Sequence, residues 1–231
     1  MGALSPRFTG VHAVHVTPEE VALLGRARAC VCACPTTERN LGDGVVPAAG
    51  LLDAGVRVAL GTDSHTQIDL LEDARELEYH LRLLSLRRNV LAPARDVDEG
   101  RVEGNTAGAA PDEAAKVGKA ADTQDDEGRG MSALAARLFE CATAGGARSI
   151  GADAGAFEPG RAADFFTVAL EDPSIAGAST EDLLPAIVFS LSRAAVRETA
   201  VGGRLIAESG CHRAQDEIVS RFAALQKRLW A

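Results

Sequence analysis

The sequence predicts an α/β fold in which short parallel strands alternate with helices. Three apolar stretches, residues 8–16, 29–34 and 56–60, have the length and composition of strands, and a helical pattern separates each from the next. Strands and helices that alternate at this spacing are typical of a parallel sheet covered by helices. The third strand lies between Gly55 and Gly61 and leads into a tight turn, and this turn is the centre of the functional prediction.

Composition narrows the classes of protein that the chain can represent. The 231 residues carry a net charge of −9, which argues against a partner with an anionic surface, such as a nucleic acid or a membrane. No apolar run approaches the ~20 residues that span a bilayer, and the first residues have no hydrophobic signal region. Five cysteines, an odd number, suit a reducing compartment. We therefore expect a cytoplasmic protein with a small-molecule substrate. The composition leaves open whether the protein forms a homodimer.

The first helix has the clearest local signals. Thr17 is placed to be the N-cap, Pro18 occupies the first helical position, and Glu20 completes a capping box. These signals predict a helix that runs to about Arg28.

Three further elements follow in the first half of the chain. Pro35 ends the second strand, and a polar loop is predicted over residues 36–44. A short helix is predicted over residues 46–54. Leucines recur at helical spacing over residues 70–84, which predicts an amphipathic helix that packs one face on the core.

The next segment differs in composition from the rest of the chain. Residues 89–129 are rich in Asp, Glu, Gly and Ala and poor in large apolar side chains. Such a segment buries too little surface to offset the entropy lost on ordering, so we expect a disordered insertion. A helix over residues 131–143 follows, and Gly145 and Gly146 are expected to end it.

The last part of the chain predicts a small β region and a final helix. Residues 159–170 read as a turn and a strand, and residues 196–208 read as a hairpin with a Gly-Gly turn. The apolar run at 183–191 fits either a helix or a strand. Residues 216–230 have the spacing of an amphipathic helix.

Asp63 and His12 are the leading candidates for chemistry. Each follows a predicted strand, and the carboxyl ends of neighbouring parallel strands bring such groups together. A carboxylate and an imidazole can hold a metal or move a proton. Two structural alternatives stay open: Asp63 caps the helix that begins near Asp69, and His12 and His15 are ordinary histidines at a strand end. Because side chains alternate along a strand, only one of the two histidines can face the interior.

The polar segment after the second strand offers further candidates. Glu38, Asn40 and Asp43 lie in a glycine-flanked stretch at the same predicted edge. Loops at such an edge commonly contact substrate. A solvated turn explains the same residues equally well, and both interpretations stay open.

The cysteines of the second strand are expected to be packing residues. Cys30, Cys32 and Cys34 alternate along the strand, whereas zinc sites usually separate paired cysteines by two to four residues around a turn. We therefore predict small thiols packed in a core. His80, on a helix, and His212, after the hairpin, are expected to be structural or exposed.

Several short motifs occur in a fixed order along the chain. They are His-Ala-Val-His at 12–15, Cys-Pro-Thr-Thr-Glu-Arg-Asn-Leu-Gly-Asp-Gly at 34–44 and Gly-Thr-Asp-Ser-His at 61–65, followed by pieces at 142–147, 158–164 and 201–204. Together they resemble the amidohydrolase superfamily. The second and third motifs are most similar to those of formimidoylglutamate deiminases, and the later pieces look like the superfamily's closing helix and small β-sandwich.

The resemblance implies a (β/α)8 barrel with one divalent metal, commonly zinc. By position, Asp63 matches a metal-binding and proton-accepting aspartate, and His12 matches a histidine that acts on protons during the reaction. His15 and His65 also match positions of the family's motifs, and we expect His65, together with Asn40 and Asp43, to bind the substrate. The implied reaction is hydrolysis at an amidine-type carbon with release of ammonia, and the implied substrate is N-formimino-L-glutamate.

Most metal ligands of such an enzyme have no counterpart in this sequence. The His-x-His pair of the first barrel strand, and the His and Glu of the fifth, are missing, so the chain resembles the C-terminal half of the enzyme. We expect the last strands and helices of a TIM barrel and a small β-sandwich portion. Asp63 alone supplies fewer than the roughly three protein ligands that a catalytic zinc needs, so tight metal binding by the chain alone is not expected. The expected parts are a barrel part at 1–88, an acidic insertion at 89–130, the closing barrel helix at 131–150, a β domain at 151–213 and a C-terminal helix at 214–231.

Two other functions compete with the deiminase. One keeps the superfamily and changes the substrate to a guanine or aminopurine ring. The other is an inactive, truncated remnant that acts as an interaction protein through an unpaired strand edge.

Overall fold

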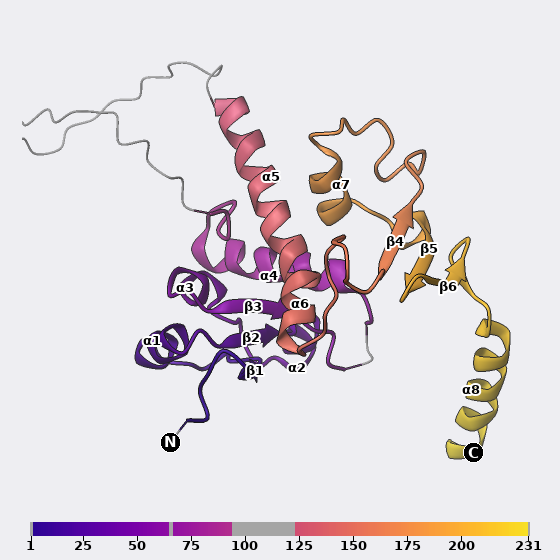
Figure 1. Cartoon of the computed structure of the whole chain (residues 1–231), viewed down its shortest axis with the longest axis horizontal. Coiled ribbons are helices and arrows are strands. Elements are labelled where there is room, and N and C mark those ends of the chain that lie inside the picture. Colours follow the sequence, from indigo (N-terminus) through magenta and orange to yellow (C-terminus); the bar gives the residue numbers. More distant parts are fainter. Residues whose placement is uncertain (1, 65–66, 94–122, 231) are drawn as a thin grey trace, which may run out of the picture.

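The computed structural model of the chain describes residues 2–64, 67–93 and 123–230. These residues form an α/β structure with two sheets (Figure 1). One sheet is parallel, with strand order β1-β2-β3, and the other is antiparallel, with strand order β4-β5-β6-β7. Within the described residues, no helix is long and apolar enough to cross a membrane.

The parallel sheet confirms the predicted alternation of strands and helices. Its middle strand is β2, which pairs with β1 on one side and with β3 on the other. Both outer strands have one edge that pairs with no other strand of the described chain. The elements of this half, in order, are β1 (Thr9–Val11), α1 (Pro18–Arg26), β2 (Cys30–Ala33), α2 (Pro35–Leu41), α3 (Ala48–Asp53) and β3 (Arg57–Leu60).

The predicted capping box is present at the start of α1. The Thr17 hydroxyl accepts the Glu20 N–H at 3.3 Å, and the Glu20 carboxylate accepts the Thr17 N–H at 2.8 Å. Strand β1, by contrast, is shorter than predicted. It ends at Val11 because His12 and Ala13 take left-handed φ angles of 65° and 55°, which turn the chain out of the strand.

Helix α2 corrects the loop that we predicted over residues 36–44. Its first residues are buried, and a distant carboxylate holds Thr36. Asp73 Oδ1 accepts hydrogen bonds from the Thr36 N–H at 3.0 Å and from the Thr36 hydroxyl at 2.8 Å. Pro35 at the first helical position and Gly42 just past the end, with φ 73°, are the local signals of this helix.

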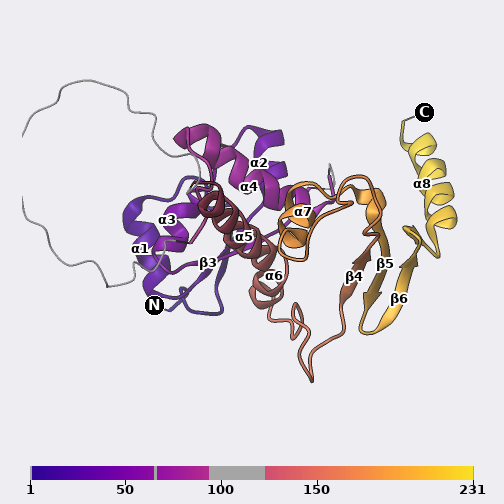
Figure 2. The ribbon, with the colours of Figure 1, turned by 90° about the horizontal axis from the view of Figure 1, so that it is seen from above.

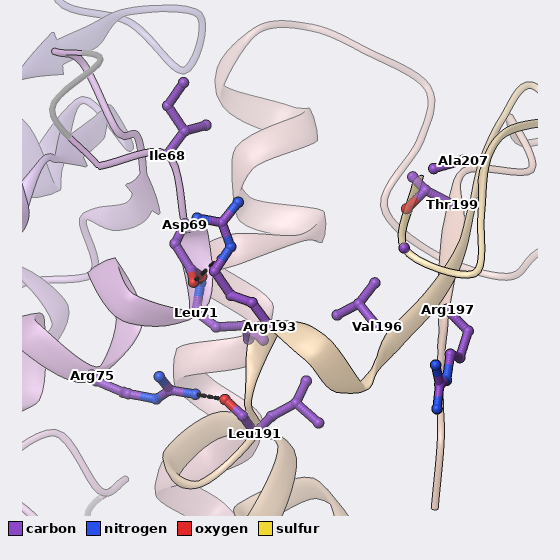
Figure 3. Close-up of a pocket in the computed structure, with 11 residues that line it drawn as sticks. Ile68, Asp69, Leu71, Arg75, Leu191, Arg193, Val196, Arg197, Thr199 and Ala207 are labelled. Carbon is purple, nitrogen blue, oxygen red and sulfur yellow. Dashed lines mark hydrogen bonds and ion pairs between the residues drawn. The ribbon is translucent and has the colours of Figure 1, made fainter. Parts of the chain in front are cut away.

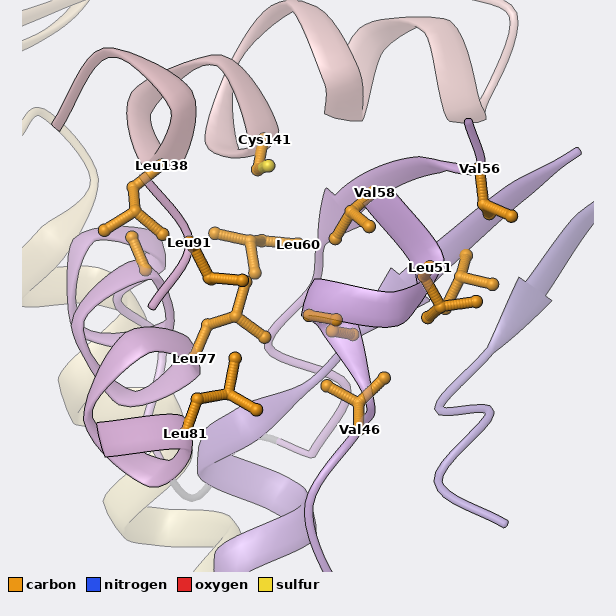
Figure 4. Packing of buried hydrophobic residues seen from close by; sticks show 14 of the residues in the cluster. Val46, Leu51, Val56, Val58, Leu60, Leu77, Leu81, Leu91, Leu138 and Cys141 are labelled. Carbon is orange, nitrogen blue, oxygen red and sulfur yellow. The ribbon is translucent and has the colours of Figure 1, made fainter. Parts of the chain in front are cut away.

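Helix α4 (Leu70–Ser85) is the predicted amphipathic helix. The Asp69 carboxylate caps it by accepting the N–H groups of Leu71 and Glu72 at 3.1 and 3.2 Å. Its apolar face joins one core with strand β3, helix α3 and helix α5 (Thr123–Ala142) (Figure 4). The largest apolar side chains that are fully buried in that core are Val31, Val46, Leu51, Val56, Leu77, Leu91, Leu134, Leu138 and Val188.

The two ends of the predicted insertion are ordered. Leu91 is only 1% exposed, and the Glu78 carboxylate accepts the N–H groups of Val90 and Leu91 at 2.9 and 3.0 Å. On the other side, the backbone is helical from Thr123. The prediction of disorder was therefore wrong for these flanks, and its remaining part, residues 94–122, lies outside the described residues.

Gly145 and Gly146 do not end a helix, as we had predicted, but lie inside helix α6 (Ala144–Ser149). A Cβ added at Gly145 would lie 2.9 Å from the Val58 carbonyl oxygen of β3. The missing side chain therefore lets the helix approach the sheet closely.

The second sheet follows as a separate layer. Its hairpin, β5 (Val196–Val201) and β6 (Arg204–Glu208), confirms the predicted Gly-Gly turn. The apolar run that fitted either element is helix α7 (Leu183–Phe189). β4 (Phe165–Val168) and β7 (Cys211–His212) complete one sheet of four strands. The predicted β-sandwich is therefore not formed by the described residues, since a sandwich needs two packed sheets.

Helix α8 (Gln215–Leu229) ends the described chain beyond β6, away from the parallel sheet (Figure 2). None of its residues is buried.

Candidate active site

The candidate site lies where the three parallel strands end. His12 follows β1, and its N–H donates to the Cys32 carbonyl of β2 at 2.9 Å; on the other side, the Gly61 N–H donates to the Ala33 carbonyl at 3.0 Å. The sequence predicts that His12 and Asp63 follow adjacent strands. This was wrong, because each crossover adds the next strand beside the last, so β2 lies between the two.

His12 contacts a buried carboxylate on α2. Its Nδ1 lies 3.3 Å from Oε1 of Glu38. The His12 side chain is 36% exposed, whereas that of Glu38 is 1% exposed. The same Oε1 accepts the Cys34 N–H at 2.9 Å, and the buried Oε2 has no hydrogen-bond partner among the described residues.

Asp63 lies in an exposed loop that the same helix supports. The Thr37 hydroxyl donates to the Thr62 carbonyl at 2.9 Å and accepts the Ser64 N–H at 3.2 Å. Asp63 itself has a left-handed φ of 48°, a conformation that costs a non-glycine residue energy and clusters at functional sites. Because Asp69 caps α4, the alternative that Asp63 is the cap was wrong.

Helix α2 therefore links the two leading candidates. Consecutive residues, Thr37 and Glu38, contact the Asp63 loop and His12 respectively. Sequence reasoning missed this link because it treated the segment as a loop. The signal that could have found it is Pro35 followed by Gly42 at the spacing of a short helix.

The other predicted site residues are less enclosed. His15 lies exposed in the turn before α1, and Asn40 and Asp43 are exposed at the end of α2 and just after it. The Asp43 N–H donates to the Glu38 carbonyl at 3.0 Å. Their predicted contacts with substrate stay predictions, and His65 lies outside the described residues.

The three cysteines near the site differ in the direction of their thiol pKa. Cys30 and Cys34 are buried and Cys32 is partly buried, and all three are free. The hydrogen bond between Cys32 and Cys34 is the largest influence on both, and it raises the pKa of the Cys34 thiol and lowers the pKa of the Cys32 thiol. Burial raises the pKa of the Cys30 thiol. A thiol with a raised pKa, as at Cys30 and Cys34, is a poor nucleophile and a poor metal ligand.

The described residues do not by themselves form a catalytic metal centre. Within them, no three His, Cys, Asp or Glu side chains are grouped so that they could hold a metal ion. Asp63 would contribute one carboxylate, and a catalytic zinc takes about three protein ligands.

A separate cavity of about 240 Å³ lies between the start of α4 and the antiparallel sheet (Figure 3). The Arg75 guanidinium in its wall donates hydrogen bonds to the Val188 and Leu191 carbonyls at 2.6 and 2.9 Å. Arg193 faces Asp69 at 3.9 Å. The cavity therefore lies at the junction of the two layers. His12 and Asp63 do not line it.

Comparison with known proteins finds one family and several relatives whose sequences are similar to this chain. The sequence model of the Amidohydrolase family matches residues 1–206. The chain is 31% identical over 220 residues to the formimidoylglutamate deiminase of Pseudomonas aeruginosa, an alignment that covers 95% of this chain and 41% of that protein. It is 30% identical over 200 residues to the 5-methylthioadenosine/S-adenosylhomocysteine deaminase of Natronomonas pharaonis, covering 85% of this chain and 36% of that protein.

Solved structures with the same fold give a consistent result. An amidohydrolase from Brucella melitensis superposes with a TM-score of 0.74 and 28% identity, covering 99% of this chain and 42% of that one. An adenosine deaminase from Xanthomonas campestris with bound zinc has a TM-score of 0.72 and 20% identity, covering 98% of this chain and 43% of that one, and shows the likeness of fold alone. The chain thus spans about two fifths of the length of these relatives.

Proposed function

The chain belongs to the amidohydrolase family, and we propose that it is the C-terminal part of a metal-dependent deiminase that hydrolyses N-formimino-L-glutamate. The observation that carries the proposal is the shared edge of the parallel sheet, where α2 contacts both His12 and the Asp63 loop. The similarity to formimidoylglutamate deiminase over 95% of the chain supports the choice of substrate. In this proposal the described part of the parallel sheet is the last part of a (β/α)8 barrel.

The proposed roles follow from the chemistry of the two side chains. A carboxylate beside the reacting carbon accepts a proton from the attacking water, which is the role of Asp63. An imidazole accepts a proton at the reacting centre and, as the imidazolium, donates a hydrogen bond where charge develops on the substituents of that carbon, which is the role of His12. The carbon–nitrogen bond then breaks, and ammonia leaves with the transferred proton.

The proposal includes one divalent metal in the complete enzyme, as in the adenosine deaminase with bound zinc. Asp63 would be one ligand. The other ligands would come from outside the described residues, because these residues lack a sufficient cluster. The chain on its own is therefore expected to bind zinc with less than one equivalent, measured by metal analysis after dialysis.

A chimera tests the proposed activity. The segment of the Pseudomonas aeruginosa enzyme that aligns with this chain is replaced by the chain, and ammonia release from N-formimino-L-glutamate is measured. We expect activity in the zinc-loaded chimera. Asp63→Asn and His12→Asn should each lower kcat by about 10²- to 10⁴-fold, the usual contribution of one acid–base group.

The controls separate this activity from its competitors. Asp53→Asn, at an exposed carboxylate at the end of α3, should keep full activity. Release of ammonia from 5-methylthioadenosine instead would favour the purine-type deaminase, as the Natronomonas relative suggests. A folded, zinc-loaded chimera that acts on neither substrate would contradict the proposal and favour the inactive remnant.

A further inference from the structure

We propose that Glu38 is a positioning residue that fixes the ring orientation and the tautomer of His12. Its importance for catalysis rests on the proposed function above, whereas the contact itself does not. The starting observation is a carboxylate, 1% exposed, whose Oε1 lies 3.3 Å from His12 Nδ1.

Glu38 is held rigidly from several directions. Its Oε1 accepts the Cys34 N–H at 2.9 Å, and its own N–H donates to the Cys34 carbonyl at 2.9 Å. Its carbonyl accepts the Asp43 N–H at 3.0 Å. The carboxylate therefore has little freedom to follow the imidazole, so the imidazole must align with it.

The backbone of His12 is also fixed. The N–H groups of His12 and Ala13 donate to the Cys32 and Val11 carbonyls, both at 2.9 Å. Both residues have left-handed φ angles, which persist only where the surroundings determine them. A fixed backbone and a fixed carboxylate together leave the ring one favoured direction.

The contact determines which ring nitrogen carries the proton. A carboxylate accepts hydrogen bonds and donates none, so Nδ1 must be the protonated nitrogen of the neutral ring. Nε2 is then left without a proton and directed away from Glu38. That nitrogen is the one available to exchange a proton at the reacting centre.

The second oxygen of Glu38 supports this assignment. Oε2 is buried and has no hydrogen-bond partner among the described residues. A buried oxygen without a partner costs about 1–3 kcal/mol, and such groups in native proteins need an explanation. A glutamine would cap Cys34 equally well through its amide oxygen, so the contact with His12 is the feature that needs the carboxylate.

Nuclear magnetic resonance of the ¹⁵N-histidine-labelled chain tests the proposal directly. Spectra are recorded at alkaline pH, where an ordinary histidine is neutral, and the His12 signals are assigned by their loss in His12→Asn. The wild-type His12 signals should show the Nδ1–H tautomer. Glu38→Gln should lower the ratio of Nδ1–H to Nε2–H by about fivefold or more, since hydrogen bonds to an ionised acceptor are roughly twice as strong as neutral ones.

The chain supplies two matched controls. His80 contacts Glu76 through Nε2 at 2.8 Å, so it should show the opposite tautomer and should not respond to Glu38→Gln. Glu78→Gln makes the same substitution at an equally buried glutamate that caps Val90 and Leu91, and it should leave His12 unchanged.

Either of two results would overturn the proposal: an Nε2–H tautomer of His12 in the wild type, or a tautomer ratio that Glu38→Gln does not change in a folded variant. Far-ultraviolet circular dichroism establishes the folding of each variant. Because the measurement uses no substrate and no metal, it succeeds or fails independently of the chimera assay.

Discussion

Asp73 is a buried carboxylate that joins two helices. Its Oδ1 holds the first turn of α2 through Thr36, while its Oδ2 has no partner among the described residues. Burial is the largest influence on it and raises the pKa of its carboxyl above the ordinary 3.8, against the opposing hydrogen bonds from Thr36.

This raised pKa predicts a pH dependence of stability. The folded state binds the proton more tightly than the unfolded state does, so the contribution of Asp73 to stability is greatest below pH 3.8 and falls as pH rises through the folded-state pKa. The free energy of unfolding of the wild type minus that of Asp73→Asn should therefore decrease with rising pH in this range. Urea unfolding at a series of acidic pH values measures it. A difference that grows with pH would show that the sign is wrong.

At the level of single residues, local chemistry predicted the capping box of Thr17 and Glu20, which is present. The functional roles of His12 and Asp63, taken from motifs, stay predictions. The contact between Glu38 and His12 could not be predicted, because it depends on the fold that brings positions 26 residues apart to hydrogen-bond distance. The left-handed φ values of His12 and Asp63 could not be predicted either, although His and Asp adopt them more often than most other non-glycine residues.

Among the elements, α6 shows why a glycine pair can mislead. Glycine often ends a helix, and that rule led us to end one at Gly145. In the structure, the tertiary requirement for close packing on β3 outweighs the local signal. Helix α2 was missed for a related reason: Thr36, Thr37 and Glu38 at its start are residue types that are usually solvated, yet all three are buried and contact distant parts of the chain. Where local signals and packing agreed, as in α1, α4 and the hairpin, the sequence was sufficient to predict the element.

Gly145 and Gly146 allow a direct test of this explanation. A Cβ at Gly145 would lie 2.9 Å from a backbone oxygen, whereas one at Gly146 would have its nearest neighbour at 3.9 Å. Gly145→Ala should lower the free energy of unfolding by about 1–3 kcal/mol, the usual cost of overpacking. Gly146→Ala should be neutral or stabilising by up to ~1 kcal/mol, because alanine favours the helix. Denaturant unfolding compares them, and equal effects would refute the packing argument.

On the scale of the whole molecule, the described parallel sheet is open at both of its outer strands. The parallel sheet has an unpaired edge on β1 and on β3 among the described residues, as expected for part of a closed barrel. The sequence predicted this through its resemblance to a family and not through periodicity, since three strands fit many α/β folds. The expectation of a β-sandwich portion also came from the resemblance to the family. The described residues form one antiparallel sheet.

We expect helix α8 to be dispensable for folding. It buries none of its own side chains; its apolar residues Ile218, Phe222 and Leu225 are 55%, 59% and 43% exposed. A chain shortened to residues 1–213 should therefore keep the melting temperature of the intact chain within a few degrees. Calorimetry of the shortened and the intact protein measures this difference. A shortened protein that melts far below the intact one would mean that α8 stabilises the rest of the chain.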